Sequence, residues 1–296
     1  MRVDKASRTA QYMALFRALE TVRSSGKRLF SDPYAVLFLD NGYKRAVRWA
    51  RFPFGRKFIQ RKIHKRMPGG FSSGVARTKY IDDLLHRSVR EGVQQVIILG
   101  AGFDMRSLRL DFLQQLPVIE IDHPNTAKLK LGTLQSQLGR LPANVRYYQL
   151  DLNEQSLDQL AVSRSLDFSL PTAFIWEGVT NYLTPQAIDQ TFAFVQQFAK
   201  GSAIIFTYID RLILEDPASF YGGDKLLNDL AEIGEPWTFG FDPETLGEYL
   251  ARFDLTLVED LSAIQYRDRY IPEWQERGYE FYRTAYAVKL LGPLEG

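Results

Sequence analysis

The chain has 296 residues, enough to bury a sizeable core, and its hydrophobic and charged shares of 45% and 24% are those of an ordinary globular protein. It has no cysteine and only three histidines, which excludes disulfides, thiolate metal sites and a cysteine nucleophile and argues against a multi-histidine metal centre. No run of about 18 apolar residues is present, and residues 1–10 lack the apolar core of a signal peptide, so we expect a cytoplasmic protein without a membrane span.

Residues 1–91 predict a helical N-terminal cap. Apolar side chains recur at helical spacing near its start, at Ala10, Met13, Ala14 and Ala18. Asp32 followed by Pro33 is typical of a helix N-cap and a proline at the first helical position. Pro68-Gly69-Gly70 then interrupts the chain before a helix that we expect from about residue 73 to residue 90.

Charge is strongly segregated within this cap. Residues 41–81 contain no Asp or Glu but twelve Lys or Arg, which leaves the rest of the chain at −10 for an overall charge of +2. One predicted helix combines six cations with an apolar stripe: Arg56, Lys57, Arg61, Lys62, Lys65 and Arg66 with Phe58, Ile59, Ile63 and Met67. Trp49, Phe52 and Phe54 precede it.

The basic segment 44–66 suits an anionic partner, which could be a membrane surface, an acidic carrier protein or an acidic substrate. The alternative is a solvated cap helix that packs on the core. We recognise no nucleic-acid-binding module in the chain, so we do not expect a nucleic acid to be the partner.

The last helix of the cap places an arginine on its apolar face. Arg77 is followed at helical spacing by Ile81, Leu84, Leu85 and Ser88. A helical arginine is usually a solvated charge. On a buried face it needs an anion instead, and the carboxylate of a bound cofactor is a suitable bidentate partner.

After Gly92, short apolar runs alternate with amphipathic stretches. The predicted strands are 96–99, 118–121, 145–150, 172–176, 203–208, 255–258 and 284–290. The predicted helices between them lie near 105–115, 125–138, 156–162, 185–199 and 243–252. This alternation predicts an α/β domain over 92–296, with a doubly wound, mostly parallel, seven-stranded sheet covered by helices on both faces.

The loop after the first predicted strand carries two glycines, Gly100 and Gly102, which allow a tight turn and a close approach to a cofactor. The pattern also fits a plain strand–helix turn. Asp122 ends the next strand, 20 residues past Gly102, where a carboxylate can accept the hydroxyls of a ribose. Met105 replaces the third glycine of the dinucleotide fingerprint, and Asp104 repels a diphosphate, which favours a cofactor without phosphate.

Two more acids follow the next two predicted strands. Asp151 could accept a hydrogen bond from an adenine amino group, or it could be a helix N-cap or turn residue; Glu177 ends the fourth strand. Ligands of open α/β sheets bind outside the carboxyl ends of the strands, so these polar positions are expected to converge on one crevice.

The chain resembles the leucine carboxyl methyltransferase family, in particular its bacterial branch of S-adenosylmethionine-dependent methyltransferases. The resemblance covers nearly the whole chain. It rests on the strings Ser7-Arg8-Thr9-Ala10, Arg17-Ala18-Leu19-Glu20, Asp32-Pro33-Tyr34-Ala35, Ala76-Arg77-Thr78-Lys79-Tyr80, Gly100 to Arg106, Glu120-Ile121-Asp122-His123-Pro124, Glu177-Gly178-Val179-Thr180-Asn181-Tyr182-Leu183 and Glu235-Pro236-Trp237-Thr238-Phe239-Gly240. It implies a class I methyltransferase-like fold.

The resemblance also implies roles for single residues. Arg77 would bind the cofactor carboxylate, Gly100 would lie against the methionyl part, Asp122 against the ribose, Asp151 against the adenine and Glu177 against the amino-acid end. The full expected cofactor set is Arg77, Gly100, Ala101, Gly102, Asp104, Arg106, Glu120, Asp122, His123, Asp151, Leu152, Glu177 and Gly178. His123 stands where an amide or apolar residue is common in the family and is expected to affect adenine packing only.

Tyr182 is expected beside the transferring methyl group, as a catalytic and substrate-binding residue, although it could instead be a packed aromatic. Residues 212–241 are expected to form a lid over the acceptor, with Tyr221 and Trp237 in contact with it; the alternative is a purely structural excursion. No metal is expected.

The expected reaction is O-methylation of a carboxylate on a small molecule or carrier-bound metabolite. A carboxylate is ionised at pH 7 and needs no general base, which agrees with the scarcity of histidine. The alternatives are methylation of a hydroxyl on a secondary metabolite, which does need a base, and a non-catalytic S-adenosylmethionine-binding protein. A nicotinamide oxidoreductase is a more distant alternative.

Overall fold

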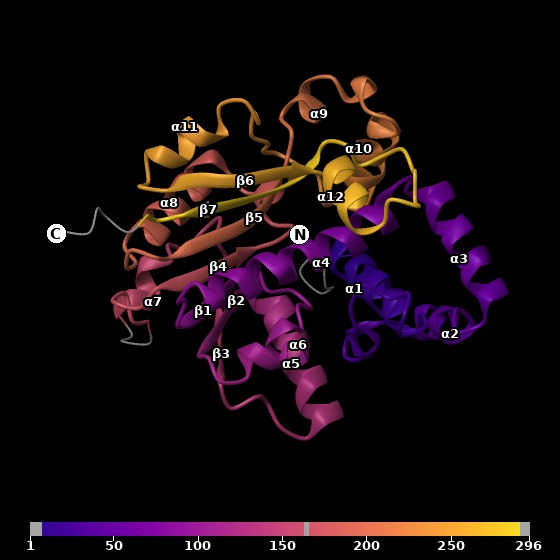
Figure 1. The fold of residues 1–296 in the computed structure, drawn as a ribbon, viewed down its shortest axis with the longest axis horizontal. Coiled ribbons are helices and arrows are strands. Elements are labelled where there is room, and N and C mark those ends of the chain that lie inside the picture. The colour runs from indigo at the N-terminus through magenta and orange to yellow at the C-terminus, as the bar shows by residue number, and fades with distance from the viewer. Residues whose placement is uncertain (1–7, 163–165, 291–296) are drawn as a thin grey trace.

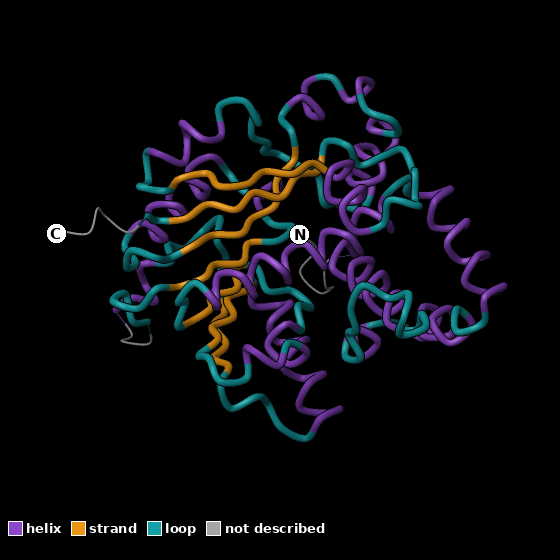
Figure 2. The backbone as a smooth tube through the Cα atoms, in the orientation of Figure 1, coloured by secondary structure: helices purple, strands orange, loops and turns teal. Residues whose placement is uncertain are grey.

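The structure, a computed structural model, describes residues 8–162 and 166–290 (Figure 1). Ser7, the first residue of the strings quoted above, lies outside these residues. A central sheet with helices on both sides occupies one part of the molecule, and several N-terminal helices extend from it (Figures 1 and 2).

The sheet has seven strands in the order β3-β2-β1-β4-β5-β7-β6. Their bounds are β1 Gln95–Leu99, β2 Val118–Asp122, β3 Val145–Gln149, β4 Thr172–Trp176, β5 Ala203–Ile209, β6 Thr256–Ser262 and β7 Tyr282–Val288. The neighbours among β1 to β5 pair in parallel, whereas β7 runs antiparallel to both β5 and β6. The predicted mostly parallel, seven-stranded sheet is therefore confirmed. The sixth strand continues to Ser262, beyond its predicted end.

The strands are joined by helices and short 3-10 turns. These are α5 Arg106–Arg109, η2 Asp111–Leu113, α6 Pro124–Leu138, α7 Asp158–Val162, η3 Thr180–Tyr182, α8 Pro185–Gln196, α9 Leu212–Glu215, η4 Pro217–Ser219, α10 Gly223–Glu232, α11 Leu246–Ala251 and α12 Ala263–Tyr270. Helix α12 was not predicted, because its sequence is largely polar. Its N-terminus is defined by a capping box between Ser262 and Gln265.

Five elements precede the sheet: α1 Arg8–Thr21, η1 Ala35–Phe38, α2 Asn41–Trp49, α3 Pro53–Arg66 and α4 Gly70–Arg90. The predicted helix after Asp32 is wrong in kind. Asp32 Oδ1 accepts hydrogen bonds from the backbone N–H groups of Tyr34 and Ala35, but it caps only the 3-10 turn η1. Asp32 also pairs with Arg17, 2.8 Å away, which ties this turn to α1.

Helix α4 packs directly on one face of the sheet. Its buried side chains share a core with alternate residues of β1, β4 and β5 and with Tyr266 of α12, while α8 and α11 cover the other face. The predicted inward face of α4 is confirmed, since Arg77, Ile81, Leu84, Leu85 and Ser88 are all buried. The boundary predicted at residue 91 stays a prediction. None of the described helices is both long and apolar enough to cross a bilayer.

Candidate functional site

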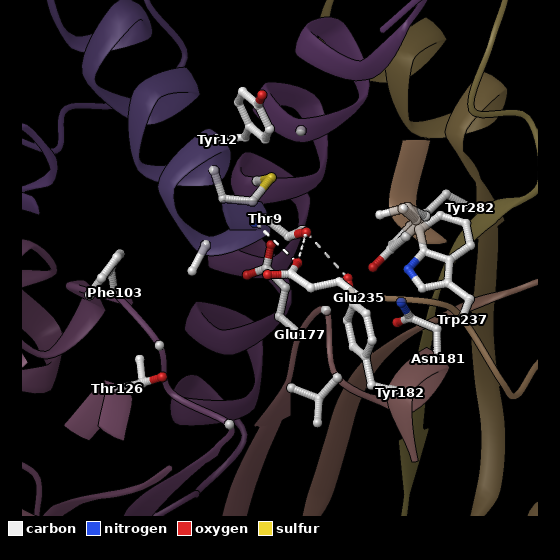
Figure 3. A pocket seen from close by; sticks show the side chains of 18 of the residues that line it. Thr9, Tyr12, Phe103, Thr126, Glu177, Asn181, Tyr182, Glu235, Trp237 and Tyr282 are labelled. Atoms are coloured by element: carbon white, nitrogen blue, oxygen red, sulfur yellow. Dashed lines mark hydrogen bonds between the residues drawn. The ribbon is translucent and has the colours of Figure 1, made fainter. Parts of the chain in front are cut away.

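A cavity of about 690 Å³ opens at the carboxyl ends of the parallel strands (Figure 3). Its walls come from α1, α4, the loop after β1, the segments that follow β2, β3 and β4, and the chain from α10 to Thr238. The volume lies within the usual range of small-molecule sites, about 300–1,000 Å³. Strand topology thus gathers groups that are far apart in the sequence.

The loop after β1 has the backbone shape that its glycines predict. Gly100 and Gly102 have φ angles of +63° and +47°, which other residues rarely adopt. A Cβ atom added at Gly100 would overlap Cγ2 of Val179, so the segment after β4 lies directly against this loop. Space for a ligand at this point therefore depends on glycine.

Asp122 ties this loop to the end of β2. Its two carboxylate oxygens accept hydrogen bonds from the backbone N–H groups of Gly102 and His123, at 2.9 Å and 2.8 Å. Burial raises the pKa of Asp122 above its ordinary value, although these two hydrogen bonds oppose the shift. The carboxylate is thus fixed in orientation at the wall of the cavity, where its remaining lone pairs can accept ligand hydroxyls.

Glu177 lies between two buried arginines. Its Oε1 atom is 3.0 Å from Nε of Arg77, and its Oε2 atom is 2.9 Å from Nη1 of Arg106. Burial acts to raise the pKa of Glu177, but Arg106 and Arg77 outweigh it and the pKa lies below its ordinary value. Arg77 also stacks on the ring of Tyr282, 4.6 Å from the ring centroid. The buried arginine thus already has an anionic partner within the protein.

The far side of the cavity is formed by the residues after β2 and β3. His123 is the N-cap of α6, and its Nδ1 atom accepts a hydrogen bond from the N–H of Asn125. Its Nε2 atom lies 3.4 Å from Oδ2 of Asp151, whose Oδ1 atom accepts from the N–H of Asn153. Asp151 therefore lines the cavity and also stabilises its own turn.

A chain of hydrogen bonds crosses the other end of the cavity, as the dashed lines in Figure 3 show. Tyr182 Oη donates to Thr9 Oγ1 at 3.4 Å, and Thr9 Oγ1 donates to Oε2 of Glu235 at 2.6 Å. The backbone N–H of Arg8 donates to Oε1 of the same carboxylate at 2.8 Å. Glu235 thereby joins the start of α1 to the segment after α10. Burial raises the pKa of Tyr182 to about 12.

Trp237 reaches the cavity from the same segment. The N–H of Thr238 donates to the carbonyl of Asn181 at 2.8 Å, which brings the strings 177–183 and 235–240 together. Nε1 of Trp237 and Oδ1 of Asn181 are buried and have no hydrogen-bond partner within the described part of the chain. Two polar atoms near Tyr182 are thus left for another molecule to satisfy.

Most of the predicted site residues line this one cavity. They are Arg77, Gly100, Ala101, Gly102, Asp104, Asp122, His123, Asp151, Leu152, Glu177, Gly178, Tyr182 and Trp237. Their individual roles stay predictions.

Three predicted site residues do not line the cavity. Arg106 is buried and pairs with Asp82, Asp104 and Glu177, which places it behind the wall. Glu120 forms a buried ion pair with Lys130. Tyr221 lies instead beside a second hollow, between α3 and residues 273–277. The predicted direct contacts of these three residues are corrected accordingly, because their side chains have other partners.

The sequence analysis gave no role to several residues that line the cavity. Thr9, Asn181 and Glu235 were part of the quoted strings, so a signal for them was present. Met13, whose sulfur lies 3.2 Å from Nη2 of Arg77, was noted only for its helical spacing. Tyr282 begins β7, and nothing in its local sequence indicates the site. Among the described residues no cluster of side chains could hold a metal ion.

Comparison with known proteins matches this geometry to a family. A model of the leucine carboxyl methyltransferase family matches residues 10–196. A protein from Streptomyces coelicolor described as a putative S-adenosyl-L-methionine-dependent methyltransferase is 32% identical over 208 residues, which cover 70% of each chain. A Frankia alni protein with the same description is 29% identical over 283 residues, covering 91% of each.

The fold has a counterpart among solved structures. A putative methyltransferase from Thermobifida fusca matches with a TM-score of 0.60 at 17% identity, covering 94% of each chain. The family match spans α1 to α8 and so includes the wall from Arg77 to Tyr182. The segment of Glu235 and Trp237, and the strand of Tyr282, lie beyond it.

Proposed function

The chain belongs to the leucine carboxyl methyltransferase family, and from this premise we propose that it transfers the methyl group of S-adenosylmethionine to a carboxylate oxygen of a small molecule or carrier-bound metabolite. The product is a methyl ester. The residues that line one continuous cavity divide into a cofactor end and an acceptor end, which agrees with a two-substrate reaction.

The cofactor end fits S-adenosylmethionine residue by residue. The Gly100 turn leaves room that a side chain would fill, and Asp122 presents an oriented carboxylate to a ribose. Arg77 and Glu177 supply one cation and one anion for the carboxylate and ammonium of an amino acid. Bound there, S-adenosylmethionine supplies an electrophilic methyl group on a sulfonium.

The observation that carries the choice of acceptor is the chemistry around Tyr182. Nearby lie the hydroxyl of Tyr182 and the unpartnered indole N–H of Trp237, and no histidine lines this end of the cavity. Two donors suit an anionic acceptor, which needs positioning and no deprotonation. The protein's task is then to hold one carboxylate oxygen in line with the methyl carbon and to exclude water.

Hydroxyl methylation is the second candidate, and Glu235 is the observation that favours it. This carboxylate is connected to Tyr182 through Thr9 and could accept a proton from an alcohol or phenol. Its oxygens, however, already accept hydrogen bonds from Arg8 and Thr9. We therefore assign Glu235 to holding α1 against the lid segment.

Product chemistry separates these candidates. The protein is incubated with methyl-labelled S-adenosylmethionine and a bacterial metabolite extract, and the labelled products are treated with mild base. A methyl ester releases labelled methanol, whereas an ether keeps its label. Ether products would overturn the carboxylate assignment, and the absence of any labelled product would favour a binding protein without catalysis.

The reaction should depend little on pH between about pH 7 and pH 9, because an acceptor carboxylate with a pKa near 4 is ionised throughout. The raised pKa of Tyr182, about 12, keeps its hydroxyl protonated and able to donate over the same range. Tyr182→Phe should raise the acceptor KM by about tenfold or more, the usual cost of losing a hydrogen bond to a charged group. A rate that rises tenfold per pH unit in the parent would indicate a general base and contradict this expectation.

Trp237 should affect the acceptor and not the cofactor. Trp237→Ala removes both the apolar wall and the indole N–H, and we expect the acceptor KM to rise by about 10- to 100-fold. Trp237→Phe keeps most of the wall and serves as the matched variant, with a smaller increase. Titration calorimetry should show unchanged S-adenosylmethionine affinity for both. Unaltered KM and kcat in Trp237→Ala would show that the segment is not a lid.

A further inference from the structure

Helices α2 and α3 meet in a corner at the edge of the molecule, separated from the sheet by α1 and α4 (Figure 1). Four large aromatic side chains on this corner are exposed: Trp49 by 42%, Phe52 by 66%, Phe54 by 77% and Phe58 by 41%. Phe52 and Phe54 are the most exposed large hydrophobic residues of the described chain. A cluster of this kind on a surface usually marks an interaction site.

The fold holds these aromatic residues outward. Val47 of α2 and Ile59 of α3 are buried and anchor the two helices to the cap. A Cβ atom at Gly55 would overlap the backbone of Trp49, so the helices touch closely at the corner. The ring centroids of Trp49 and Phe58 lie 5.2 Å apart. The exposure therefore belongs to a packed, defined corner.

The predicted apolar stripe of α3 divides between two faces. Ile59, Ile63 and Met67 pack against the cap, as the solvated-helix alternative expects, whereas Phe58 faces outward. The outward face of α3 is thus aromatic as well as basic, which a merely solvated helix does not require.

Cations without carboxylate partners surround the aromatic cluster. The segment 44–66 carries Lys44, Arg45, Arg48, Arg51, Arg56, Lys57, Arg61, Lys62, Lys65 and Arg66. Within the described residues, no carboxylate lies within ion-pair distance of any of them; the nearest acidic contact of the segment is Glu276, 3.7 Å from His64. Lys62 lies over the ring of Phe58, 4.8 Å from the centroid. The positive charge is therefore available to an external anion.

We propose that the corner formed by α2 and α3 docks on a bilayer surface rich in anionic lipid. Phe52 and Phe54 enter the interface between head groups and acyl chains, Trp49 and Phe58 lie at head-group level, and the cations contact lipid phosphates. An acidic protein would satisfy the charges, but it would also have to cover four exposed aromatic side chains. A bilayer interface accommodates both features, which decides between these partners.

The test is co-sedimentation of the full chain with vesicles of equimolar phosphatidylglycerol and phosphatidylcholine, compared with phosphatidylcholine alone. Binding is expected only to the anionic vesicles, and it should weaken as salt is added. Phe52→Ser with Phe54→Ser should lower the partition coefficient by at least about tenfold. Serine is a favoured residue at the N-cap, which is the position of Phe52 in α3, so the helix should be retained.

A second variant and a control separate charge from insertion. Lys57→Gln, Arg61→Gln and Lys62→Gln together should weaken binding by about 100-fold at low salt. Leu129→Ser on α6 removes a side chain that is 45% exposed elsewhere, and it should leave binding unchanged.

Several results would overturn the proposal. These are no binding to anionic vesicles, equal binding to phosphatidylcholine alone, and full binding by the double phenylalanine variant. Capture by an acidic acyl carrier protein, lost in that variant while vesicles are not bound, would assign the corner to an acidic protein instead.

Discussion

Replacing Arg77 with alanine should weaken the binding of S-adenosylmethionine by about 30- to 1000-fold, because truncating one partner of a buried charged pair usually costs at least about 2 kcal/mol. Arg77 is only 4% exposed and holds the cavity side of Glu177. Without it, the carboxylate of the cofactor loses its cation, while Glu177 keeps its contact with Arg106 and adds a negative charge close by. The fold should persist, since Arg106 still neutralises Glu177.

Titration calorimetry with S-adenosylmethionine and S-adenosylhomocysteine measures this loss, and both ligands should lose affinity alike because they share the amino-acid end. Arg77→Lys should recover only part of the affinity, since a point charge cannot reproduce the planar fork. Arg87→Ala is the matched control: it removes an exposed ion pair with Glu91 from the same helix. If Arg77→Ala binds both ligands as tightly as the parent, Arg77 serves only to pair with Glu177.

Gly100→Ala should have the second large effect. Its φ of +63° costs an alanine about 1–2 kcal/mol, and the overlap of the new Cβ with Val179 adds roughly 1–3 kcal/mol of overpacking. Together they should lower the free energy of unfolding by about 2–5 kcal/mol and move the loop into the space for the cofactor. Chemical denaturation and calorimetric titration measure the two consequences.

Two companion variants identify the cause. At Gly102 a Cβ atom would find its nearest neighbour 3.8 Å away, so Gly102→Ala should suffer only the backbone cost. Val179→Ala removes the clashing methyl group and should restore part of the stability and affinity of Gly100→Ala. No restoration in the double variant would mean that backbone strain alone explains the loss.

The parts of the fold that were predicted correctly depend on local sequence. The buried β-branched run of β1 and the glycine loop after it define their own conformations, and the acids at the strand ends converge because parallel strands share an edge. Spacing alone could not tell which side of the wall a residue faces. Arg106 and Glu120 lie close to the loop in sequence, yet they turn away to Asp82 and Lys130.

The partners of the acceptor end were beyond the reach of a local pattern. Tyr282 begins a strand that adds to β5 in antiparallel fashion, so its position under Arg77 follows only from the complete sheet order. The exposure of Phe52 and Phe54 likewise depends on the angle at which α2 meets α3, which no periodicity specifies. Tertiary packing decided each of these points.

The hydrogen bond between Thr9 and Glu235 has a consequence for biosynthesis. It joins residues 226 positions apart, at the start of α1 and after α10. A ribosome makes the N-terminal residues first, so α1 emerges long before the carboxylate that fixes it and before Tyr282. A nascent chain can therefore form the glycine loop early, but it cannot enclose an acceptor until most of the polypeptide has been synthesised. Premature methylation by unfinished chains is thereby prevented by the order in which the walls are made.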